Sequence, residues 1–259
     1  MDPNQRTYER FAHEYTTCQL WPPERIILDR FKTEWRRFRV LDLGVGTGRT
    51  SYTFAAVARE YVGVDYAAAM IDGCRATIGE TGSVHFQVAD ARDLSRFADG
   101  SFDFVLFCWN GIDAVGHDDR LCILREVRRV LRADGHFFFS THTIYDFPFL
   151  EDPPRIDAGA LVRSTYRRTR ALLRNAALRW KYRKLDPAVI TQQPYAILTP
   201  PDHDFGIDAY YIRPDRQPDQ LRDAGFQIVT TYDQHGGAVD PMTTRHRGYL
   251  YFLSSPLSC

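Results

Sequence analysis

The sequence lacks the long apolar run that a membrane-spanning helix needs. No stretch of its 259 residues approaches the roughly 20 consecutive apolar residues that cross a bilayer. The N-terminal segment 1–6 is polar and shows no apolar stretch typical of a secretory signal. From these two absences we expect a protein without a membrane span that is located in the cytoplasm.

Cysteine is also scarce and is not clustered. The five cysteines are odd in number and form no C-x-x-C pair; they are Cys18, Cys74, Cys108, Cys122 and Cys259. This usage favours reduced thiols over a disulfide framework. Because no cysteines and histidines share the spacing of zinc ligands, we expect no metal site.

The chain has no excess of charge of either sign, with 33 basic and 33 acidic residues. A formal net charge of zero argues against an electrostatic attraction of the whole protein to nucleic acid. The exception is the segment 163–184, which contains nine Lys and Arg residues and no acid. Three interpretations stay open: a solvated helix face, an anion site for a phosphate or carboxylate on a substrate, and a docking surface for RNA or an acidic membrane.

What the sequence does contain is a glycine-rich turn after an apolar strand. Residues 40–48 read Val-Leu-Asp-Leu-Gly-Val-Gly-Thr-Gly, and residues 49–58 can form the helix that follows. Glycines at alternate positions let backbone N–H groups approach a ligand closely. The helix that follows offers unpaired N–H donors. The turn therefore predicts a site for a nucleotide-like cofactor.

The spacing of this turn differs from the G-x-G-x-x-G of dinucleotide sites, because Arg49 stands where the third glycine would be. Asp42 places a carboxylate at the strand tip, which would repel a pyrophosphate and attract a cationic group. A D-x-G-x-G-x-G turn of this kind resembles that of the class I S-adenosylmethionine-dependent methyltransferases. A dehydrogenase is disfavoured by the same two features.

Two further acids follow in the order that this family shows. Asp65 ends the apolar run 61–65 and is placed to accept hydrogen bonds from ribose hydroxyls. Asp90 stands near the end of the predicted strand 84–91, and the resemblance implies that Asp90 and the backbone of Ala91 hold the adenine. It also implies cofactor contacts from Asp42, Gly44, Gly46, Gly48, Tyr66, Cys108 and, in the segment that precedes the first strand, Tyr15. The implied cofactor is S-adenosylmethionine, with S-adenosylhomocysteine as its product.

The order of elements predicts an α/β fold: a doubly wound, mostly parallel seven-stranded sheet whose last strand is antiparallel. Predicted strands cover 40–43, 61–65, 84–91, 102–108, 136–141, 226–232 and 248–253. An amphipathic helix is predicted over 118–131 with Gly135 as its left-handed cap, and another over 214–224 that stops at Gly225. We expect one domain over 1–259. It begins with an N-terminal cap over 1–37, which is helical but interrupted at Pro22-Pro23, and continues with a cofactor-binding core over 38–145. A lid for substrate recognition follows between strands five and six over 146–212, loop-like over 192–206, and residues 213–259 complete the core sheet.

Methyl transfer is an in-line displacement in which positioning supplies most of the advantage, so no catalytic triad is expected. His142, after the fifth strand, is the candidate general base, and a plain hydrogen-bonding role is the alternative. Asn110 could orient an acceptor atom or hold a turn. Trp109, Tyr145, Tyr210 and Tyr211 are the candidate walls of the substrate pocket; core packing is the alternative for the tyrosine pair.

These features together predict a methyltransferase that acts on a nitrogen or oxygen of a small-molecule acceptor, for which an anionic or a planar molecule would fit. An RNA- or tRNA-directed methyltransferase, or a protein that binds S-adenosylmethionine without catalysis, is the alternative on the same fold. Nucleic acid is disfavoured as a partner, because the Asn/Asp-Pro-Pro-Tyr typical of enzymes that methylate amino groups in DNA or protein is replaced by residues 109–112, Trp-Asn-Gly-Ile. The sequence does not specify the acceptor or the oligomeric state.

Overall fold

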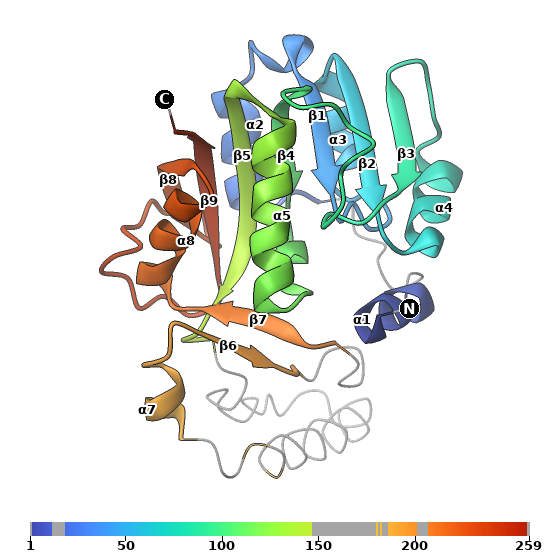
Figure 1. Cartoon of the computed structure of the whole chain (residues 1–259). Helices are drawn as coiled ribbons and strands as arrows, with labels where there is room; N and C mark the ends of the chain where they lie inside the picture. Colours follow the sequence, from blue (N-terminus) through green and yellow to red (C-terminus); the bar gives the residue numbers. More distant parts are fainter. Residues whose placement is uncertain are drawn as a thin grey trace, which may run out of the picture.

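A mixed β-sheet forms the centre of the molecule (Figure 1). The computed structural model describes residues 2–11, 19–146, 180, 182, 186–200 and 207–257. Within these residues the strands are β1 (Arg39–Leu43), β2 (Glu60–Asp65), β3 (Val84–Val88), β4 (Phe102–Phe107), β5 (Leu131–Thr143), β6 (Tyr195–Leu198), β7 (Ala209–Ile212), β8 (Phe226–Asp233) and β9 (Tyr249–Pro256). The helices are α1 (Pro3–Phe11), α2 (Pro22–Arg30), η2 (Trp35–Arg37), α3 (Ser51–Val57), α4 (Ala68–Thr77), η3 (Gly111–Asp113), α5 (His117–Val130), α7 (Pro187–Ile190), η5 (Pro214–Arg216) and α8 (Gln217–Asp223).

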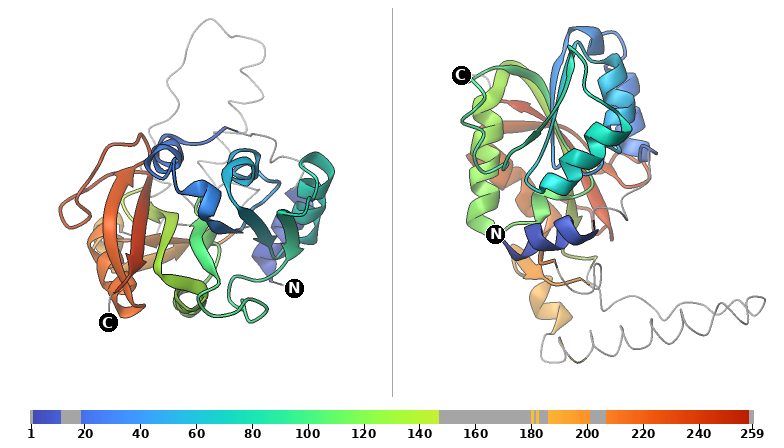
Figure 2. Two further views of the ribbon diagram at one scale, coloured as in Figure 1. Left: turned by 90° about the horizontal axis from the view of Figure 1, so that it is seen from above. Right: turned by 90° about the vertical axis from the view of Figure 1, so that its right-hand side faces the viewer.

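Helices cover both faces of the sheet, which gives two hydrophobic cores. On one face α5 and α8 pack through Leu124, Val127 and Leu221. On the other, α2 and η2 pack through Ile27 and Trp35 beside residues of α3 and α4. The two layers are visible when the sheet is seen edge-on (Figure 2). Burial on both faces explains why the central strands are continuously apolar rather than alternating.

The doubly wound prediction is confirmed. β3, β2, β1, β4 and β5 are parallel neighbours in that order, and β9 runs antiparallel between β5 and β8. These are the seven predicted strands. Because parallel strands end at the same edge, the turns after β1, β2, β3 and β4 gather along one side of the sheet.

Two additional strands lie beyond the predicted seven, so the sheet has nine strands within the described residues. β7 pairs in parallel with the end of β5 at His142 and Thr143, and β6 pairs antiparallel with β7. The loop-like assignment over 192–206 is therefore wrong for Tyr195–Leu198. These residues form a strand because they pair with Ala209–Ile212, a contact between segments that local sequence does not specify.

Several element boundaries also differ from the predictions. Gly135 is not a left-handed helix cap: α5 ends at Val130, Leu131 is already extended, and β5 begins there. A Cβ on Gly135 would lie 2.5 Å from the Leu131 side chain, so glycine serves close packing in an irregular part of the β4–β5 pair. Helix α3 starts at Ser51 rather than at residue 49. The Pro22-Pro23 pair does not interrupt a helix but begins α2, where the missing N–H of proline costs nothing.

The prediction of a helix that stops at Gly225 is confirmed, since α8 ends just before this glycine, whose φ is +83°. None of the helices in the described part of the chain has the length and apolar character needed to span a membrane.

The elements that frame the site are the carboxyl ends of β1 to β5, with α1 and the β6–β7 pair along that edge (Figure 1).

Candidate active site

The turn after β1 is shaped by three glycines with positive φ, +59° at Gly44, +58° at Gly46 and +93° at Gly48. A Cβ on Gly44 would lie 2.7 Å from the Phe107 ring, and one on Gly48 would lie 2.3 Å from Ile78. A Cβ on Gly46 would meet nothing within 4 Å, and Gly46 lines a cavity. The outer glycines therefore serve packing, while the space beside Gly46 is free for a ligand.

Asp42 lies at the end of β1 and lines the same cavity, although its side chain is almost fully buried. Its Oδ2 accepts hydrogen bonds from the hydroxyls of Thr50 and Tyr61, the latter at 2.6 Å. Burial raises the pKa of the Asp42 carboxyl to about 6, against the opposing effect of these two donors. The result is a buried carboxylate, oriented by its Oδ2 contacts, beside a cavity that could hold a cationic group.

Asp65 ends β2 and is held by backbone donors. Its Oδ2 accepts from the N–H of Gly46 at 3.0 Å and its Oδ1 from the N–H of Ala67 at 2.9 Å. Burial raises the pKa of Asp65 to about 6. Each carboxylate oxygen has a second lone pair, so both can still accept a hydroxyl from a ligand.

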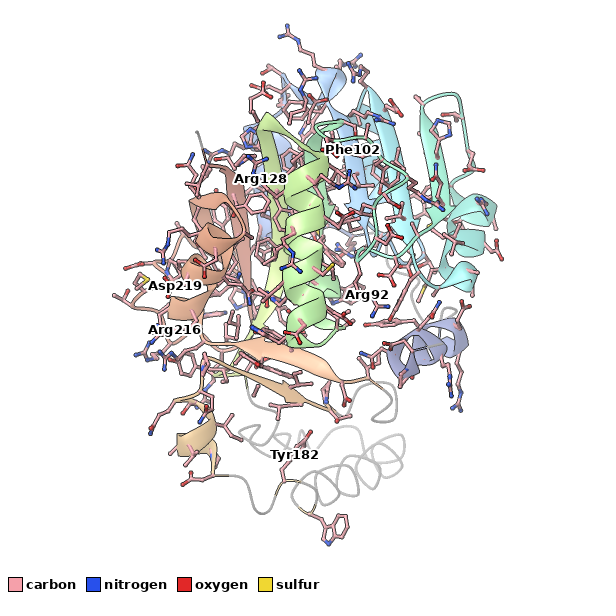
Figure 3. The ribbon with its side chains drawn as sticks, in the orientation of Figure 1. Arg92, Phe102, Arg128, Tyr182, Arg216 and Asp219 are labelled. Atoms are coloured by element: carbon pink, nitrogen blue, oxygen red, sulfur yellow. The ribbon has the colours of Figure 1, made fainter. Side chains whose placement is uncertain are left out.

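Asp90 follows β3 and lines the cavity, but its carboxylate is paired with an arginine. Arg92 donates from Nε and a terminal nitrogen to Asp90, the closest contact being 2.6 Å. Arg92 also contacts Asp119 of α5 at 2.7 Å. Arg92 lies near the lower end of α5 in Figure 3 and fixes the orientation of the Asp90 carboxylate there.

A single cavity of about 560 Å³ joins these residues to the ends of β4 and β5. On one side lie Gly46, Asp42, Asp65 and the segment 89–91. On the other side the lining residues include Trp109, Asn110, Asp113, His142, Pro200, Ile207, Ala209 and Tyr249; we call this the acceptor side. A cavity of this size and mixed lining fits a cofactor and a small substrate together.

The turn after β4 carries two residues in the left-handed region, Trp109 with φ +53° and Asn110 with φ +58°. The N–H of Asn110 donates to Ser140 Oγ at 2.7 Å, which ties the turn to β5. The buried Oδ1 of Asn110 has no hydrogen-bond partner among the described residues. Arg49 lies over the Trp109 ring at 5.2 Å and forms a bidentate buried ion pair with Glu24 of α2, with both contacts at 2.6 Å. The strained turn thus presents Trp109 and Asn110 to the cavity.

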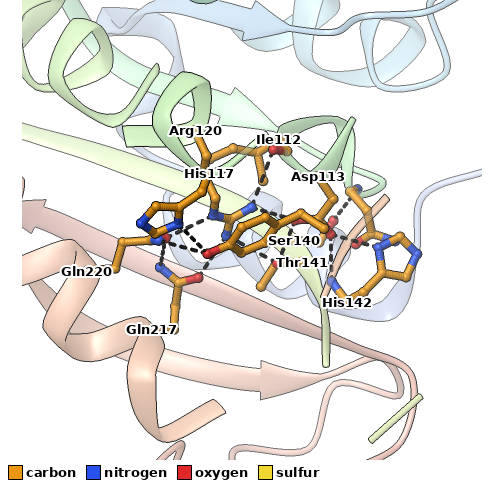
Figure 4. A network of polar contacts seen from close by, with 11 residues as sticks. Ile112, Asp113, His117, Arg120, Ser140, Thr141, His142, Gln217 and Gln220 are labelled. Atoms are coloured by element: carbon orange, nitrogen blue, oxygen red, sulfur yellow. Dashed lines mark hydrogen bonds and ion pairs between the residues drawn. The ribbon is translucent and has the colours of Figure 1, made fainter. Parts of the chain in front are cut away.

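His142, near the end of β5, is held by a buried carboxylate that the sequence did not reveal. Its Nδ1 and its backbone nitrogen each lie 2.7 Å from Oδ2 of Asp113, in η3. The Tyr211 and Tyr249 rings flank the imidazole, with centroids 4.9 and 5.1 Å away. Figure 4 shows the imidazole and the carboxylate facing one another. Held in this way, His142 can act on a ligand through its remaining ring nitrogen.

Asp113 belongs to a larger buried network (Figure 4). Its Oδ1 accepts from Arg120 of α5 at 2.5 Å and from Thr141 Oγ1 at 2.7 Å. The Arg120 guanidinium is fully buried and also donates to Gln217 and Gln220 of α8, at 2.8 and 2.9 Å. The charge of Asp113 is therefore balanced inside the protein.

Helix α1 lies beside the cavity and contacts several of the elements that surround it. The side-chain nitrogen of Asn4 donates to the carbonyls of Ala114 and Asp208, and its oxygen accepts from the N–H of Asp208. Gln5 donates to the Tyr66 carbonyl at 2.7 Å. Glu9 accepts from the first backbone N–H groups of α4, including that of Ala68 at 2.7 Å. Tyr8 of α1 lines the cavity.

Comparison with known proteins explains this arrangement. Residues 40–135 match the family described as methyltransferase domain. Over this segment the chain is therefore similar to methyltransferase domains. Its glycine turn, its three acids and the turn after β4 all lie within the matched segment.

Curated relatives of the methyltransferase domain match part of the chain. An uncharacterized methyltransferase of Bacillus subtilis, YcgJ, is 35% identical over 117 residues, which is 44% of this chain and 44% of that protein. A demethylmenaquinone methyltransferase of Clavibacter sepedonicus is 32% identical, over 44% of this chain and 46% of that protein. The matches thus span about half the length of these relatives or less.

Solved structures share the fold over the whole chain. The CcbJ methyltransferase of Streptomyces caelestis has a TM-score of 0.62 at 16% identity and covers 100% of both chains. The 1,6-didemethyltoxoflavin N1-methyltransferase of Burkholderia thailandensis, with its substrate and S-adenosylhomocysteine bound, has a TM-score of 0.62 at 16% identity, over 99% of this chain and 88% of that one. At these identities the likeness concerns the fold.

The residues of this methyltransferase domain fit S-adenosylmethionine. The free space beside Gly46 provides room for a close ligand contact, Asp42 offers a negative group for a cationic part, and Asp65 has acceptor capacity for ribose hydroxyls. No group of three or more His, Cys, Asp or Glu side chains suited to a metal ion occurs in the described ranges.

Most residues predicted for the site line the cavity of the domain. They are Asp42, Gly44, Gly46, Asp65, Tyr66, Asp90, Ala91, Cys108, Trp109, Asn110 and His142. Gly48 does not, because it faces Ile78 and Cys74. Tyr15, and the basic segment 163–184 apart from positions 180 and 182, lie outside the described residues.

The three predicted substrate tyrosines are not among the cavity-lining residues. Tyr210 is fully buried, and its hydroxyl lies 2.8 Å from Nδ1 of His117. Tyr211 packs against His142, and Tyr145 lies under Arg245 at 5.2 Å. Core packing therefore describes the tyrosine pair in β7 better than a place on the substrate wall. Successive residues of a strand face opposite sides of the sheet, so the two tyrosines point in opposite directions. The sequence does not show that both sides of the sheet are covered at this position, and it therefore could not predict that both rings are buried.

Proposed function

We propose that the chain transfers a methyl group from S-adenosylmethionine to an oxygen or nitrogen of a small-molecule acceptor. The observation that carries the proposal is the continuous cavity, which joins the glycine turn and its acids to His142 and Trp109 on the acceptor side. S-adenosylmethionine, when bound, supplies an electrophilic methyl group on a positively charged sulfonium. The protein's contribution is to hold two reactants in line and to exclude water.

Asp42 and Asp65 would hold the cofactor beside the free space at Gly46. Asp42 attracts the positive part of the molecule, and Asp65 accepts from the ribose. The Asp90 carboxylate is paired with Arg92. The adenine would therefore lie against the part of the cavity wall that residues 89–91 form, rather than depend on a free Asp90 carboxylate. These roles follow the family resemblance and the fit of the donor set.

The acceptor side favours a small, partly planar molecule. Trp109 offers an aromatic face, and Pro200, Ile207 and Ala209, from the segment proposed as the lid over 146–212, supply apolar contact. Helix α1 and the β6–β7 pair lie along the same edge of the sheet (Figure 1), and Tyr8 of α1 and Ala209 of β7 line the cavity. A cavity of about 560 Å³ suits a small molecule better than an RNA helix.

Binding experiments test the proposal directly. We expect S-adenosylmethionine and S-adenosylhomocysteine to bind in isothermal titration and to raise the melting temperature, and NAD to do neither. Asp65→Asn should weaken binding about tenfold or more, because an amide that replaces one carboxylate oxygen cannot accept a hydrogen bond there. The matched control is Asp72→Asn, an exposed carboxylate of α4, which should bind like the wild type. Tight binding of NAD with no affinity for the sulfur compounds would overturn the proposal.

A further inference from the structure

We infer that the acceptor is a hydroxyl compound whose proton passes to Nε2 of His142, and that Asp113 and Arg120 are the residues that position this base. The inference rests on the proposed methyl transfer and narrows its acceptor to an oxygen that carries hydrogen. It combines the cavity position of His142, the contacts of Asp113, and the chemistry of the acceptor side.

The contacts of Asp113 determine which nitrogen of His142 carries a proton. Oδ2 of Asp113 can only accept, so the 2.7 Å contact with Nδ1 requires an N–H there. In the neutral imidazole the lone pair then lies on Nε2. The backbone N–H of His142 donates to the same oxygen, and the two flanking tyrosine rings hold the plane of the imidazole. These contacts orient the ring so that Nε2 is the nitrogen left to accept a proton from a ligand.

Arg120 shares the Asp113 carboxylate with His142, so that Asp113 orients the imidazole while its charge also has a guanidinium partner. An isolated buried carboxylate would stabilise a permanent imidazolium, and an imidazolium cannot accept a proton. Here the fully buried Arg120 guanidinium donates to the other oxygen of Asp113 at 2.5 Å, and Thr141 donates to the same oxygen. Gln217 and Gln220 accept from Arg120 and fix it in turn. The negative charge of Asp113 is thus balanced by Arg120 within the buried network.

The charges around the acceptor side favour a hydroxyl over an amine. An aliphatic amine acceptor is protonated at neutral pH, and its ammonium would require a carboxylate partner; an aromatic amine is neutral there and is compared with the matching phenol below. Among the described residues around this side, Asp113 is the nearest carboxylate, but its side chain is 1% exposed and accepts from four donors. Trp109, Pro200 and Ile207 provide an apolar or aromatic wall instead. This lining suits a neutral hydroxylated molecule.

A hydroxyl is also the acceptor that needs this base. Alcohols and phenols are weak nucleophiles until the proton leaves. In the proposed step the acceptor O–H bond breaks and its proton goes to Nε2 of His142, while the oxygen forms a bond to the methyl carbon. The bond from that carbon to sulfur breaks and its electron pair stays on sulfur. The products are a methyl ether, S-adenosylhomocysteine and a His142 imidazolium, which then returns its proton to water.

Nitrogen NMR of the full chain labelled with ¹⁵N-histidine tests the arrangement without any acceptor. His142→Gln assigns the resonances of His142. At neutral pH we expect a protonated Nδ1 and an unprotonated Nε2 in the wild type. In Asp113→Asn we expect a loss of this single tautomer, because the amide can present either an acceptor or a donor. The control Asp118→Asn, an exposed neighbour in the first turn of α5, should leave the spectrum unchanged. A wild-type His142 with hydrogen on Nε2, or doubly protonated, would overturn the inference.

Matched acceptors test the substrate class. Phenol, catechol and 2-naphthol are compared with aniline, 1,2-diaminobenzene and 2-naphthylamine, with transfer of a tritiated methyl group as the readout. We expect methylation of a hydroxyl member and a fall in kcat of roughly 100-fold in His142→Gln with KM changed less. Faster methylation of the amines, or full turnover in His142→Gln, would overturn the inference.

Cofactor binding separates this inference from the proposed function. His142→Gln and Asp113→Asn should both bind S-adenosylhomocysteine with the wild-type affinity, since neither side chain is assigned to the cofactor. If the NMR result fails while the cofactor binds, the base assignment is wrong and the methyltransferase proposal stands. If the wild type binds neither sulfur compound, the proposed function itself fails.

Discussion

At the scale of single residues, Asn110 combines a strained backbone with an unsatisfied buried side chain. A left-handed conformation costs an ordinary residue about 1–2 kcal/mol, and asparagine and glycine tolerate it best. Asn110 has φ +58°, follows Trp109 in the same region, and leaves Oδ1 without a hydrogen bond among the described residues. Such a combination at a cavity wall is typical of functional positions. A structural role in the turn and a role toward the acceptor both fit this geometry.

Two substitutions separate these roles. We expect Asn110→Ala to be less stable than Asn110→Gly by about 1 kcal/mol in urea unfolding, because alanine disfavours positive φ. If the amide orients the acceptor, both variants lose turnover alike; if Asn110 only holds the turn, the glycine variant keeps it. Equal stability of the two variants would contradict the strain assigned to this turn.

At the scale of elements, α1 connects segments that are remote in the sequence. Asn4 bridges the loop before α5 to Asp208 in the segment before β7, and Glu9 accepts from the N-terminus of α4. These hydrogen bonds lie beside the cavity, and Tyr8 of the same helix lines it. A nine-residue helix is marginal by itself, so these side chains keep α1 in place.

Asn4→Ala removes three hydrogen bonds of α1, each worth about 1 kcal/mol. We expect S-adenosylhomocysteine to dissociate roughly tenfold faster in stopped-flow experiments, and the amides of α1 to exchange faster. Gln227→Ala in β8, where the side chain has one long contact to Pro256, is the control and should change neither rate. An unchanged dissociation rate in Asn4→Ala would show that α1 does not retain the ligand.

At the scale of the whole molecule, the two acids that would hold the cofactor lower the free energy of unfolding at neutral pH. Asp42 and Asp65 are buried carboxylates whose pKa values burial raises to about 6. A folded pKa above the unfolded value means that the native state binds the proton more tightly. The free energy of unfolding therefore falls as pH rises from about 4, where the unfolded group ionises, to about 6, where the folded group ionises. Above that range the loss stays constant. Function at neutral pH requires the less stable, ionised form.

Asp42→Asn should make the protein more stable and less able to bind its cofactor. A rise in pKa from 3.8 to about 6 corresponds to about 3 kcal/mol, and the Asn oxygen can still accept from Thr50 and Tyr61. We expect the free energy of unfolding at neutral pH to increase by about 1–3 kcal/mol and the gain to disappear near pH 4. Calorimetric titration should show weaker binding of S-adenosylmethionine. A less stable variant at neutral pH would contradict the charge assigned to Asp42.

The sequence alone determined the layered core and the cofactor side of the cavity. Continuous apolar strands predict a sheet buried on both faces, and the glycines and acids at strand ends, Asp42 and Asp65 among them, are local signals. These features depend on neighbouring residues, so they can be read along the chain.

The tertiary structure alone decided what surrounds His142. Asp113 is 29 residues away in the sequence, and Arg120 is held by α8, about 100 residues further along. Tyr210 and Tyr211 were predicted as substrate walls, yet the pairing of β7 with β6 and β5 buries them. A carboxylate that orients a histidine, and a strand formed by contact with another strand, depend on residues brought together by folding. Their physical cause is non-local, which is why no pattern along the chain could specify them.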